Sequence, residues 1–308
     1  MITVVGSLNM DLIIRVPRFP EPGEAIHGED LSTACGGKGA NQAYAIARMG
    51  QSVHMVGCVG ADAFGDEMVE NLRAAGVDTR GVLRRADKAS GTAMILVHNG
   101  TGQNEIVVAS GANRTLTAAD VHNAADVLRQ SDAVVAQLET TLSATQAAMA
   151  LAREAGRLSV LNPAPFMPLD DELLNLCDYL IPNENEASQL AGLGVRDPES
   201  AAAAAGLLRS RGARNVLITL GAGGVWVESE TWRGHMPAFP VRAVDTVAAG
   251  DTFIGAFVAR LVEGASVREA AQFGCAASAI AVTRPGAQPS IPSREEVTAF
   301  LRVRNEAT

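Results

Sequence analysis

The chain has 308 residues and a formal net charge of −9 at pH 7. This length is sufficient to bury a sizeable core, and the acidic balance argues against a partner that offers a phosphate backbone or an anionic membrane surface. The N-terminus lacks the basic start of a signal peptide, and no apolar run approaches the length of a membrane span. We therefore expect a cytoplasmic protein that binds a small molecule, with no nucleic-acid or membrane partner.

The four cysteines are scattered along the chain, at Cys35, Cys58, Cys177 and Cys275. They form no C-x-x-C pair and have no neighbouring histidine pattern, so neither a disulfide framework nor a zinc site is indicated. Because free cysteine is usually buried, we expect buried or incidental thiols.

Short apolar runs alternate with longer, Ala-rich runs over the first two thirds of the chain. The strand-like runs cover residues 2–8, 53–60, 132–139, 158–165, 178–183 and 215–221. The helix-like runs cover residues 38–50, 63–76, 117–130, 143–156 and 198–212. This alternation predicts an α/β fold with a mostly parallel sheet. The last third predicts two tandem helices over 251–282 and a final helix near 293–301.

Two segments break this alternation, residues 10–35 and 91–111. Both are typical of extended hairpins, and the second has a turn at NGTGQ, residues 99–103. We expect one domain over 1–308 in which these inserted β segments form a lid over a ligand; a decorative extension of the sheet is the alternative. A small sheet with one apolar face needs a cover, which predicts homodimerisation through it.

Residues 35–42, CGGKGANQ, look like a nucleotide loop but fail the Walker A pattern, because Ser32 takes the place of its first glycine and Gly39 follows the lysine. The glycines would instead allow the backbone to approach a small polyol, with Lys38 and Asn41 at a helix start in reach of its hydroxyls. A glycine turn that merely caps a helix is the alternative.

Polar residues that follow the predicted strands are candidates for ligand binding, because ligands of open α/β sheets collect at the carboxyl ends of the strands. The tetrapeptide NENE (183–186) also has the spacing of a capping box, and GAGG (221–224) is also consistent with a tight hairpin. The candidates are Asn9, Asp11, Glu139, Asn183, Glu186 and the GAGG segment.

An aspartate, Asp251, lies in the first turn of the helix predicted from residue 251 onward, directly after Ala248, Ala249 and Gly250. Backbone N–H groups in such a turn have no intrahelical partner and can hold an anion. Capping and the helix dipole are the ordinary alternative explanation of an acidic residue at this position.

Eight motifs together extend over nearly the whole chain: GSLNMD, PEPGE, GGKGANQA, LNPAP, PNENEA, ITLGAGGVW, AVDTVAAGDTFIGAF and AVTRPGAQPSIP. In their order and spacing the chain resembles the ribokinase family, within the phosphofructokinase-B type of sugar and nucleoside kinases. The resemblance implies a three-layer α/β/α domain with a small β-sheet lid that also forms a dimer clasp. It further implies ATP-dependent phosphorylation of the 5-hydroxyl of ribose, with deoxyribose, pseudouridine or another furanoside as alternative substrates.

The resemblance also implies roles for individual residues. Asp251 matches the general base, and the anion hole matches Ala248, Ala249 and Gly250. The sugar-binding positions match Asn9, Asp11, Gly37, Lys38, Asn41 and Glu139. The nucleotide-binding positions match Asn183, Thr219, Gly221, Gly224, Gly250 and Cys275. Glu186 would organise Mg²⁺ through water, and a K⁺ site matches Asp245, Val247, Ala281, Arg284, Gly286 and Ser290.

Three positions depart from the commoner pattern of the family. Ile254 replaces a polar residue, Cys275 replaces a histidine near the adenine, and Pro285 replaces a lysine. These departures leave open how adenine is bound and, to a smaller extent, which sugar is the substrate. Two other classes of protein are disfavoured: a non-catalytic sugar-binding protein would not need Asp251 with its anion hole, and a dehydrogenase would need a G-x-G-x-x-G loop, which VVGSLNMD lacks.

Overall fold

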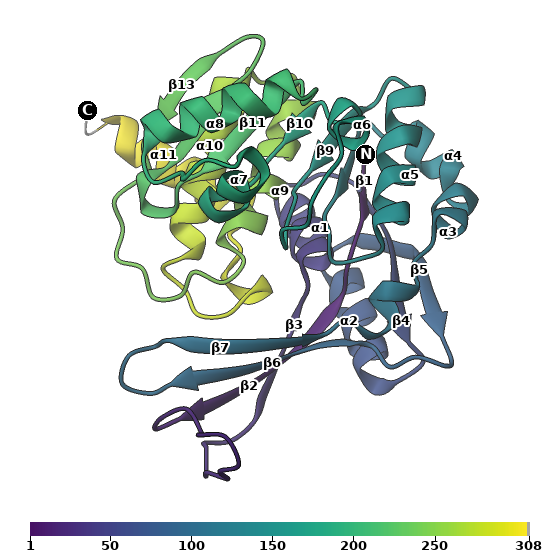
Figure 1. Cartoon of the computed structure of the whole chain (residues 1–308), viewed down its shortest axis with the longest axis vertical. Helices are drawn as coiled ribbons and strands as arrows, with labels where there is room; N and C mark the ends of the chain where they lie inside the picture. Colours follow the sequence, from purple (N-terminus) through teal and green to yellow (C-terminus); the bar gives the residue numbers. More distant parts are fainter. Residues whose placement is uncertain (307–308) are drawn as a thin grey trace.

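A nine-stranded sheet forms the middle layer of the computed structural model, which describes residues 1–306 (Figure 1). From β11 to β5 neighbouring strands are parallel, whereas β12 and β13 continue the sheet in antiparallel fashion. The spatial order is β13 (Arg233–Met236), β12 (Val225–Glu228), β11 (Asn215–Thr219), β10 (Tyr179–Leu180), β9 (Leu158–Leu161), β8 (Ala133–Ala136), β1 (Ile2–Val5), β4 (Val53–Gly60) and β5 (Val77–Arg85).

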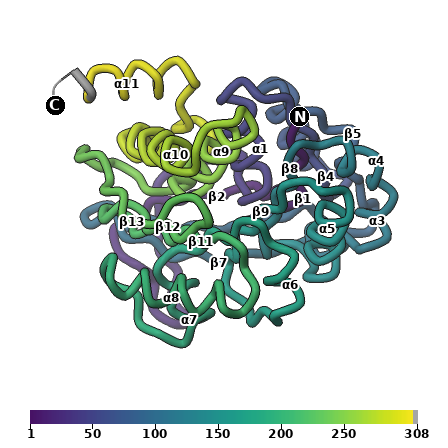
Figure 2. The backbone as a smooth tube through the Cα atoms, turned by 90° about the horizontal axis from the view of Figure 1, so that it is seen from above, coloured from purple at the N-terminus to yellow at the C-terminus, as the bar shows by residue number. Residues whose placement is uncertain are grey.

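Helices cover both faces of this sheet, and each face has its own apolar core (Figure 2). One core is completed by α3 (Ala118–Asn123), α4 (Ala125–Gln130), α5 (Leu142–Glu154), α6 (Asp171–Asn175), α7 (Glu184–Ala191) and α8 (Pro198–Ser210). The opposite core is completed by α1 (Lys38–Arg48), α2 (Ala63–Ala74), α9 (Ala249–Val262) and α10 (Val267–Ala281), and α11 (Arg294–Glu306) packs outside them. The predicted three-layer α/β/α fold is confirmed.

Most long helices begin at a capping side chain. Asp62, Thr141, Asp197 and Ser266 each accept a hydrogen bond from the backbone N–H three residues later, at 2.8 to 3.3 Å. Such caps satisfy one of the N–H groups that a helix start leaves without an intrahelical acceptor. The start of α9 differs, because its N-cap residue is Ala248 and no side chain caps it.

A separate four-stranded sheet, called here the small sheet, projects from the body (Figure 1). Its central strands pair in parallel, and the turn at residues 99–103 joins β6 to β7 as predicted. The spatial order is β3 (Ser32–Gly36), β2 (Asn9–Val16), β6 (Gly91–His98) and β7 (Asn104–Ala109). Both predicted hairpin segments contribute to this sheet; the division of the chain into one domain with a lid stays a prediction.

Three details of the sequence interpretation need correction. Asn9 and Asp11 come after β1 but do not directly end it, because β1 ends at Val5 and both residues lie in β2 of the small sheet, with Asp11 in the predicted hairpin segment 10–35. The helical run 117–130 is two helices, broken at Ala124, whose ψ of 9° departs from helical geometry. The strand β5 was not predicted, because it is an edge strand rich in polar residues.

The four cysteines are free thiols, of which Cys35 is partly buried and the other three are buried. Within residues 1–306, no helix combines the length and the apolar character that crossing a bilayer demands.

Candidate active site

The glycine-rich segment before α1 brings the start of this helix against β2. Gly37 caps the helix with a φ of 90°, and a Cβ there would lie 2.7 Å from the backbone nitrogen of Asn9. A Cβ at Gly36 would lie 2.5 Å from the Oδ2 atom of Asp11. Both positions therefore require glycine, the first for its left-handed backbone and both for close approach. The segment is a helix-capping turn, and the same turn brings Lys38 towards Asn9 and Asp11.

Glu139 lies at the N-terminus of α1, just beyond the carboxyl end of β8. Its Oε2 atom accepts a hydrogen bond from the backbone N–H of Lys38, at 3.0 Å, and another from the hydroxyl of Ser7. A carboxylate is favourable at a helix N-terminus because the exposed N–H groups and the helix dipole attract negative charge. One oxygen of Glu139 is thus held by the protein, and the carboxylate faces the region between β2 and α1.

Asp251 is held by two amide side chains of α1. Its Oδ2 atom accepts from Nδ2 of Asn41 at 3.0 Å, and its Oδ1 atom accepts from Nε2 of Gln42 at 2.9 Å. The carboxylate makes no capping bond to the start of α9, so capping does not explain it. The N-cap residue Ala248 has a φ of 58°, a left-handed conformation that costs an alanine roughly 1 to 2 kcal/mol.

The helix start beside Asp251 is open to an anion. The second and third residues of α9, Gly250 and Asp251, have N–H groups without an intrahelical acceptor. A Cβ built at Gly250 would meet no atom within 4 Å. The strained backbone at Ala248 thus directs this helix end at free space next to a buried carboxylate, and the site could accept a phosphoryl group there.

Three carboxylates act on one lysine at this site, and a fourth carboxylate, that of Asp11, interacts with two of the three. Burial, then the nearby Glu139 and Asp251, raise the pKa of Asp11 to about 7. Burial also raises the pKa of Glu186. For Lys38 burial opposes the charge, but the carboxylates of Asp251, Glu139 and Glu186 outweigh it and hold its pKa above the ordinary value. The site therefore keeps a charged lysine among carboxylates whose negative charge is not fully balanced.

On the predicted nucleotide side, Asn183 and Thr219 form a parallel bridge between neighbouring strand ends. Asn183 and Glu186 make a reciprocal capping box at the start of α7, with both bonds at 2.9 Å. The segment 221–224 closes a hairpin from β11 to β12, and Gly224 is required there because a Cβ would lie 2.1 Å from the Met236 carbonyl oxygen. Both structural alternatives drawn from the sequence are therefore present at these motifs.

Cys275 differs from the other predicted nucleotide residues. It lies within α10 among the buried apolar residues that pack against α9, and burial raises the pKa of its thiol to about 12. The thiol is therefore neutral at physiological pH, and its predicted contact with the nucleotide stays a prediction.

The two loops of the predicted K⁺ site are tied together by Asp245. Its Oδ1 atom accepts from the N–H of Val247 at 3.0 Å, and its Oδ2 atom accepts from the N–H of Gly286 at 2.9 Å. The Ala281 carbonyl accepts from the N–H of Arg284, whose guanidinium pairs with Glu296 at 2.5 Å. The hydroxyl of Ser290 donates to the Ala287 carbonyl at 2.7 Å. In the described part of the chain, no three His, Cys, Asp or Glu side chains form a metal cluster.

Several amide residues at the site were not predicted. Gln137 and Asn162 directly follow β8 and β9, so the rule that ligand sites follow strand ends would have found them. Gln42 stands in the quoted CGGKGANQ segment next to Asn41. Asn113 carries no such signal; its side chain bonds to both backbone groups of Leu8 and to Oδ1 of Asn9, and so holds the root of β2.

Comparison with known proteins agrees with this geometry. A pfkB family carbohydrate kinase profile matches residues 1–294. The chain belongs to the pfkB family of carbohydrate kinases. Ribokinase of Haemophilus influenzae is 45% identical over 300 residues, which are 97% of this chain and 98% of that protein. Deoxyribokinase of Salmonella typhimurium is 36% identical over 301 residues, with 97% and 98% covered.

A solved structure extends the comparison. Arabidopsis thaliana ribokinase, described in complex with ribose and ATP, superposes with a TM-score of 0.92 at 32% identity, over 98% of each chain. The resemblance to the ribokinase family that the sequence motifs predicted is confirmed, and the chain is a sugar kinase by family. The roles of the individual site residues remain predictions.

Proposed function

We propose that the protein transfers the γ-phosphoryl group of ATP to the 5-hydroxyl of D-ribose, giving ribose 5-phosphate and ADP. The observation that carries this proposal is the buried Asp251 carboxylate beside the open N-terminus of α9. One helix end thus offers a proton acceptor and anion-binding N–H groups within the same turn. Relatives named ribokinase, and a neighbour solved with ribose and ATP, support ribose and ATP as the substrates.

In this reaction Asp251 accepts the hydroxyl proton while the hydroxyl oxygen attacks the γ-phosphorus. The bond from this phosphorus to the bridging oxygen breaks, and ADP leaves with the electron pair. Negative charge on the equatorial oxygens would be stabilised at the predicted anion hole of Ala248, Ala249 and Gly250, where the N–H groups of Gly250 and Asp251 have no intrahelical acceptor. Preorganised donors of this kind act strongly because they do not need to reorient during the reaction.

The sugar would bind between β2 and the start of α1. Asn9, Asp11, Lys38, Asn41 and Glu139 all border this space, and Gly37 allows the backbone to approach. A carboxylate that accepts from two ring hydroxyls, and a lysine that donates to another, are residue types suited to a polyol. On the far side of the helix start, Asn183, Thr219, Gly221 and Gly224 would border the nucleotide.

A panel of sugars tests the proposal. We expect the highest kcat/KM for ADP release with D-ribose, compared with 2-deoxyribose, fructose, pseudouridine and adenosine. A higher value with 2-deoxyribose would favour the activity named for the Salmonella relative. Absence of ADP release with every sugar would contradict a kinase and favour a sugar-binding protein.

Mg²⁺ would enter with ATP, and Glu186 is the residue suited to orient it. One oxygen of Glu186 bonds to the backbone N–H of Asn183, which holds the carboxylate in place and leaves its second oxygen to accept from a metal-bound water. Bound Mg²⁺ neutralises phosphate charge. Replacing Glu186 with Gln should raise the Mg²⁺ concentration needed for half-maximal rate, and an unchanged requirement would contradict this role.

K⁺ would bind where Asp245 joins the two loops, held mainly by backbone carbonyls with Val247, Ala281, Arg284, Gly286 and Ser290 as the matching positions. The cation would fix the loop that leads into Ala248 and strengthen the positive field at the anion site. We expect K⁺ to raise activity well above the level in Na⁺, and Asp245→Ala to reduce this effect. Equal rates in K⁺-depleted and K⁺-replete assays at matched ionic strength would exclude the site.

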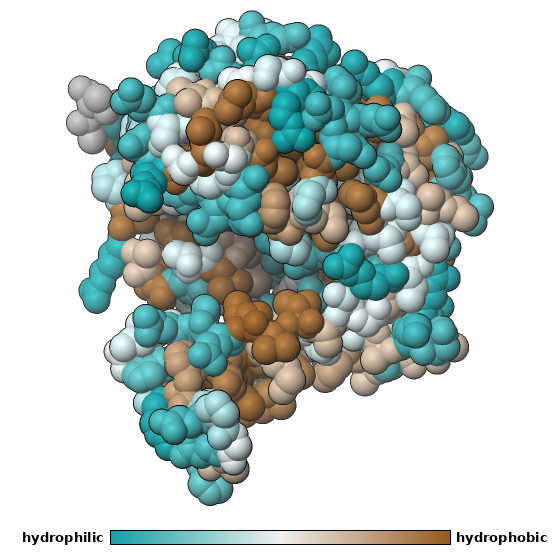
Figure 3. Space-filling model, in the orientation of Figure 1, coloured by the Kyte–Doolittle hydropathy of each residue, from teal (hydrophilic) through white to brown (hydrophobic). Residues whose placement is uncertain are grey.

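A homodimer through the small sheet is the proposed assembly. Side chains alternate across a strand, so Asp11 faces one side while its neighbour Leu12 faces the other. Leu12 pairs with Met94, and Met94 pairs with Val107, so these three form an apolar row on the face opposite Asp11. Val107 is 69% exposed, and Figure 3 shows apolar side chains gathered over this sheet.

Such a row needs a cover, and a second copy of the sheet would supply one. Sedimentation should give a dimer that Val107→Glu converts to monomer, whereas a monomeric wild-type protein would contradict the assembly. A cytoplasmic location and the lack of a nucleic-acid partner stay predictions from composition.

A further inference from the structure

A chain of buried amides leads from β8 to the carboxylate of Asp251. Gln137, directly after β8, donates from Nε2 to Oε1 of Gln42 at 2.6 Å. Gln42 donates from its own Nε2 to Oδ1 of Asp251 at 2.9 Å and to Oδ1 of Asn162 at 3.2 Å. Gln42 is 0% exposed and Gln137 1% exposed. Neither residue has a role in the reaction described above.

The orientation of every amide in this chain follows from one backbone group. Asn162 donates from Nδ2 to the carbonyl of Ile181 at 2.8 Å, and a carbonyl can only accept. The Oδ1 atom of Asn162 must then face Gln42, so Gln42 turns its N–H groups towards Asn162 and Asp251. Its Oε1 atom in turn faces Gln137. The hydrogen-bonding partners of these amides therefore require that the Nε2 atom of Gln42, and not its Oε1 atom, faces Asp251.

The chain of amides leaves one buried oxygen without a hydrogen bond. The Oε1 atom of Gln137 is buried and has no hydrogen-bond partner within residues 1–306. The backbone at Gly6 approaches it closely, since a Cβ there would lie 2.1 Å from this oxygen. A buried carbonyl without a donor is unfavourable, and such groups call for an explanation. Orienting Gln42 is a function that would explain it.

We propose that Gln42 is a positioning residue for Asp251 and that Gln137 fixes the orientation of Gln42. The proposal rests on the function of Asp251 as the base. Asn41 and Gln42 hold one carboxylate oxygen each, so the plane of the carboxylate is set from two consecutive residues of α1. This helix packs tightly on α9, because a Cβ at Gly255 would lie 2.5 Å from the Cβ of Ala45. A rigid frame therefore aims the remaining lone pairs of Asp251 at the sugar hydroxyl.

The variant Gln42→Met tests this role, because it keeps the length of the side chain and removes the donor. Hydrogen bonds to charged groups correspond to roughly 10- to 100-fold in an equilibrium or a rate, so we expect kcat to fall by about that factor. The KM for ribose and its calorimetric affinity should stay within about 2-fold. Gln51→Met is the matched control, since it removes an amide bond to Glu263, measured at 2.6 Å, beyond the far end of α1.

A double-mutant cycle distinguishes positioning from a general structural effect. In an Asp251→Asn background, measured by single turnover, Gln42→Met should cost less than about 2-fold further, because the group it positions is gone. The same loss in both backgrounds would overturn the proposal, and so would an unchanged kcat in Gln42→Met. If that variant fails to fold, Gln137→Met provides the same cycle, with a smaller expected loss.

The outcomes also separate this proposal from the proposed function. Near-normal kcat in Asp251→Asn would show that Asp251 is not the base, so its role as the base and the positioning role would both fall, while the kinase activity itself would stand. A large loss in Asp251→Asn together with normal kcat in Gln42→Met and Gln137→Met would leave the kinase mechanism intact and overturn the positioning role alone.

Discussion

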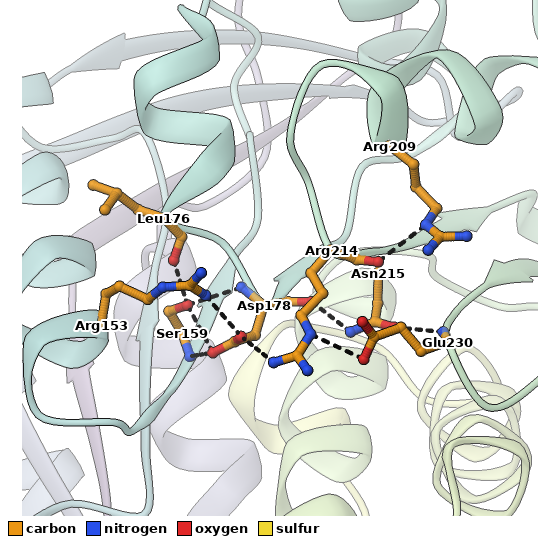
Figure 4. A network of polar contacts seen from close by, with 8 residues as sticks. All are labelled: Arg153, Ser159, Leu176, Asp178, Arg209, Arg214, Asn215 and Glu230. Carbon is orange, nitrogen blue, oxygen red and sulfur yellow. Dashed lines mark hydrogen bonds and ion pairs between the residues drawn. The ribbon is translucent and has the colours of Figure 1, made fainter.

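Two buried aspartates, each 7% exposed, lie at opposite ends of the strands of the central sheet. Asp178 precedes β10 at the amino end, where Arg153 and Arg214 point towards its carboxylate and pair with it at 3.4 Å each (Figure 4). The same carboxylate accepts from the backbone N–H and the hydroxyl of Ser159, at 3.0 and 3.1 Å. Asp251, at the other end, meets two neutral amides and no arginine.

The difference in surroundings suits Asp178 to a structural role and Asp251 to the proposed role in the reaction. Donors surround Asp178, and its neighbours tie β9, β10 and β11 together at their amino ends. Near Asp251 lie the further carboxylates of Asp11, Glu139 and Glu186. Lys38 is the cation that interacts with the carboxylates of Asp251, Glu139 and Glu186. Protein donors occupy the lone pairs of the Asp178 carboxylate, whereas a carboxylate held by two amides keeps lone pairs for a substrate hydroxyl.

Removing the acid at the open end should have the largest effect on the reaction. Asp251→Asn keeps the shape of the side chain and removes the proton acceptor, and a positioned base contributes about 10²- to 10⁴-fold. We expect kcat to fall within that range while calorimetry still detects ribose binding. Near-normal turnover would mean that substrate positioning alone carries the catalysis.

Asp11 should affect binding more than turnover. Its loss in Asp11→Ala leaves ring hydroxyls without a buried partner, which costs roughly 1 to 3 kcal/mol, or about 5- to 150-fold in affinity. Isothermal titration with ribose measures this directly. If the affinity of the variant equals that of the wild type, the sugar site lies elsewhere.

The raised pKa of Asp11, about 7, predicts a pH dependence of binding. The ionised carboxylate accepts on both oxygens and more strongly than the neutral acid, so the affinity for ribose should fall by up to about tenfold per pH unit below pH 7. Lys38, Glu139 and Asp251 face the same space, and Asp11→Asn is the control that isolates Asp11 from them. A slope in Asp11→Asn equal to that of the wild type would assign the titration to another group.

The same raised pKa has a consequence for stability, because the native state holds this proton more tightly than the unfolded chain. The contribution of Asp11 is fully present below its unfolded pKa of about 4 and is lost as the pH rises towards about 7. Urea unfolding of the wild type should therefore lose stability relative to Asp11→Asn over this interval, and parallel curves would contradict the assignment.

Asp178 should show the smallest effect on catalysis and a clear effect on stability. In Asp178→Ala the buried backbone N–H of Ser159 loses its acceptor, which should lower the free energy of unfolding by about 1 to 3 kcal/mol. The KM and kcat values should stay within about 2-fold of the wild type, as measured beside urea unfolding. A fall in kcat comparable with that of Asp251→Asn would contradict the assignment of a purely structural role to Asp178.

Much of the fold was predictable because its elements are locally encoded. The run 53–60 is apolar apart from His54, as expected of a strand buried on both faces, and β4 has the predicted bounds. Capping residues such as Asp62 and Asp197 mark helix starts in the sequence itself. The edge strand β5 was missed because its exposed positions carry polar residues, which resemble those of a loop.

The candidate site was predictable as a set of residues and not as a network. Resemblance to a family named Asp251 and Asn41, but they are 210 positions apart, and only the packing of α1 on α9 brings them to 3.0 Å. The same holds for Gln42 and Gln137, which are 95 positions apart. Their hydrogen bond fixes the Gln42 amide so that its NH2 group, and not its carbonyl oxygen, points at Asp251. No local pattern records the direction in which an amide points.

The sequence by itself determined the alternation of strands and helices, the helix caps, the glycines that the turns require and the family, because these depend on neighbouring residues or on whole motifs. Only the tertiary structure decided that Asn9 begins a strand of the small sheet, that Asp251 is held by amides instead of capping its helix, and that Asp178 is held by two arginines and Ser159. Those outcomes depend on which distant groups are brought within about 3 Å when the layers close, since a buried polar group is stable only with the partners that packing delivers to it.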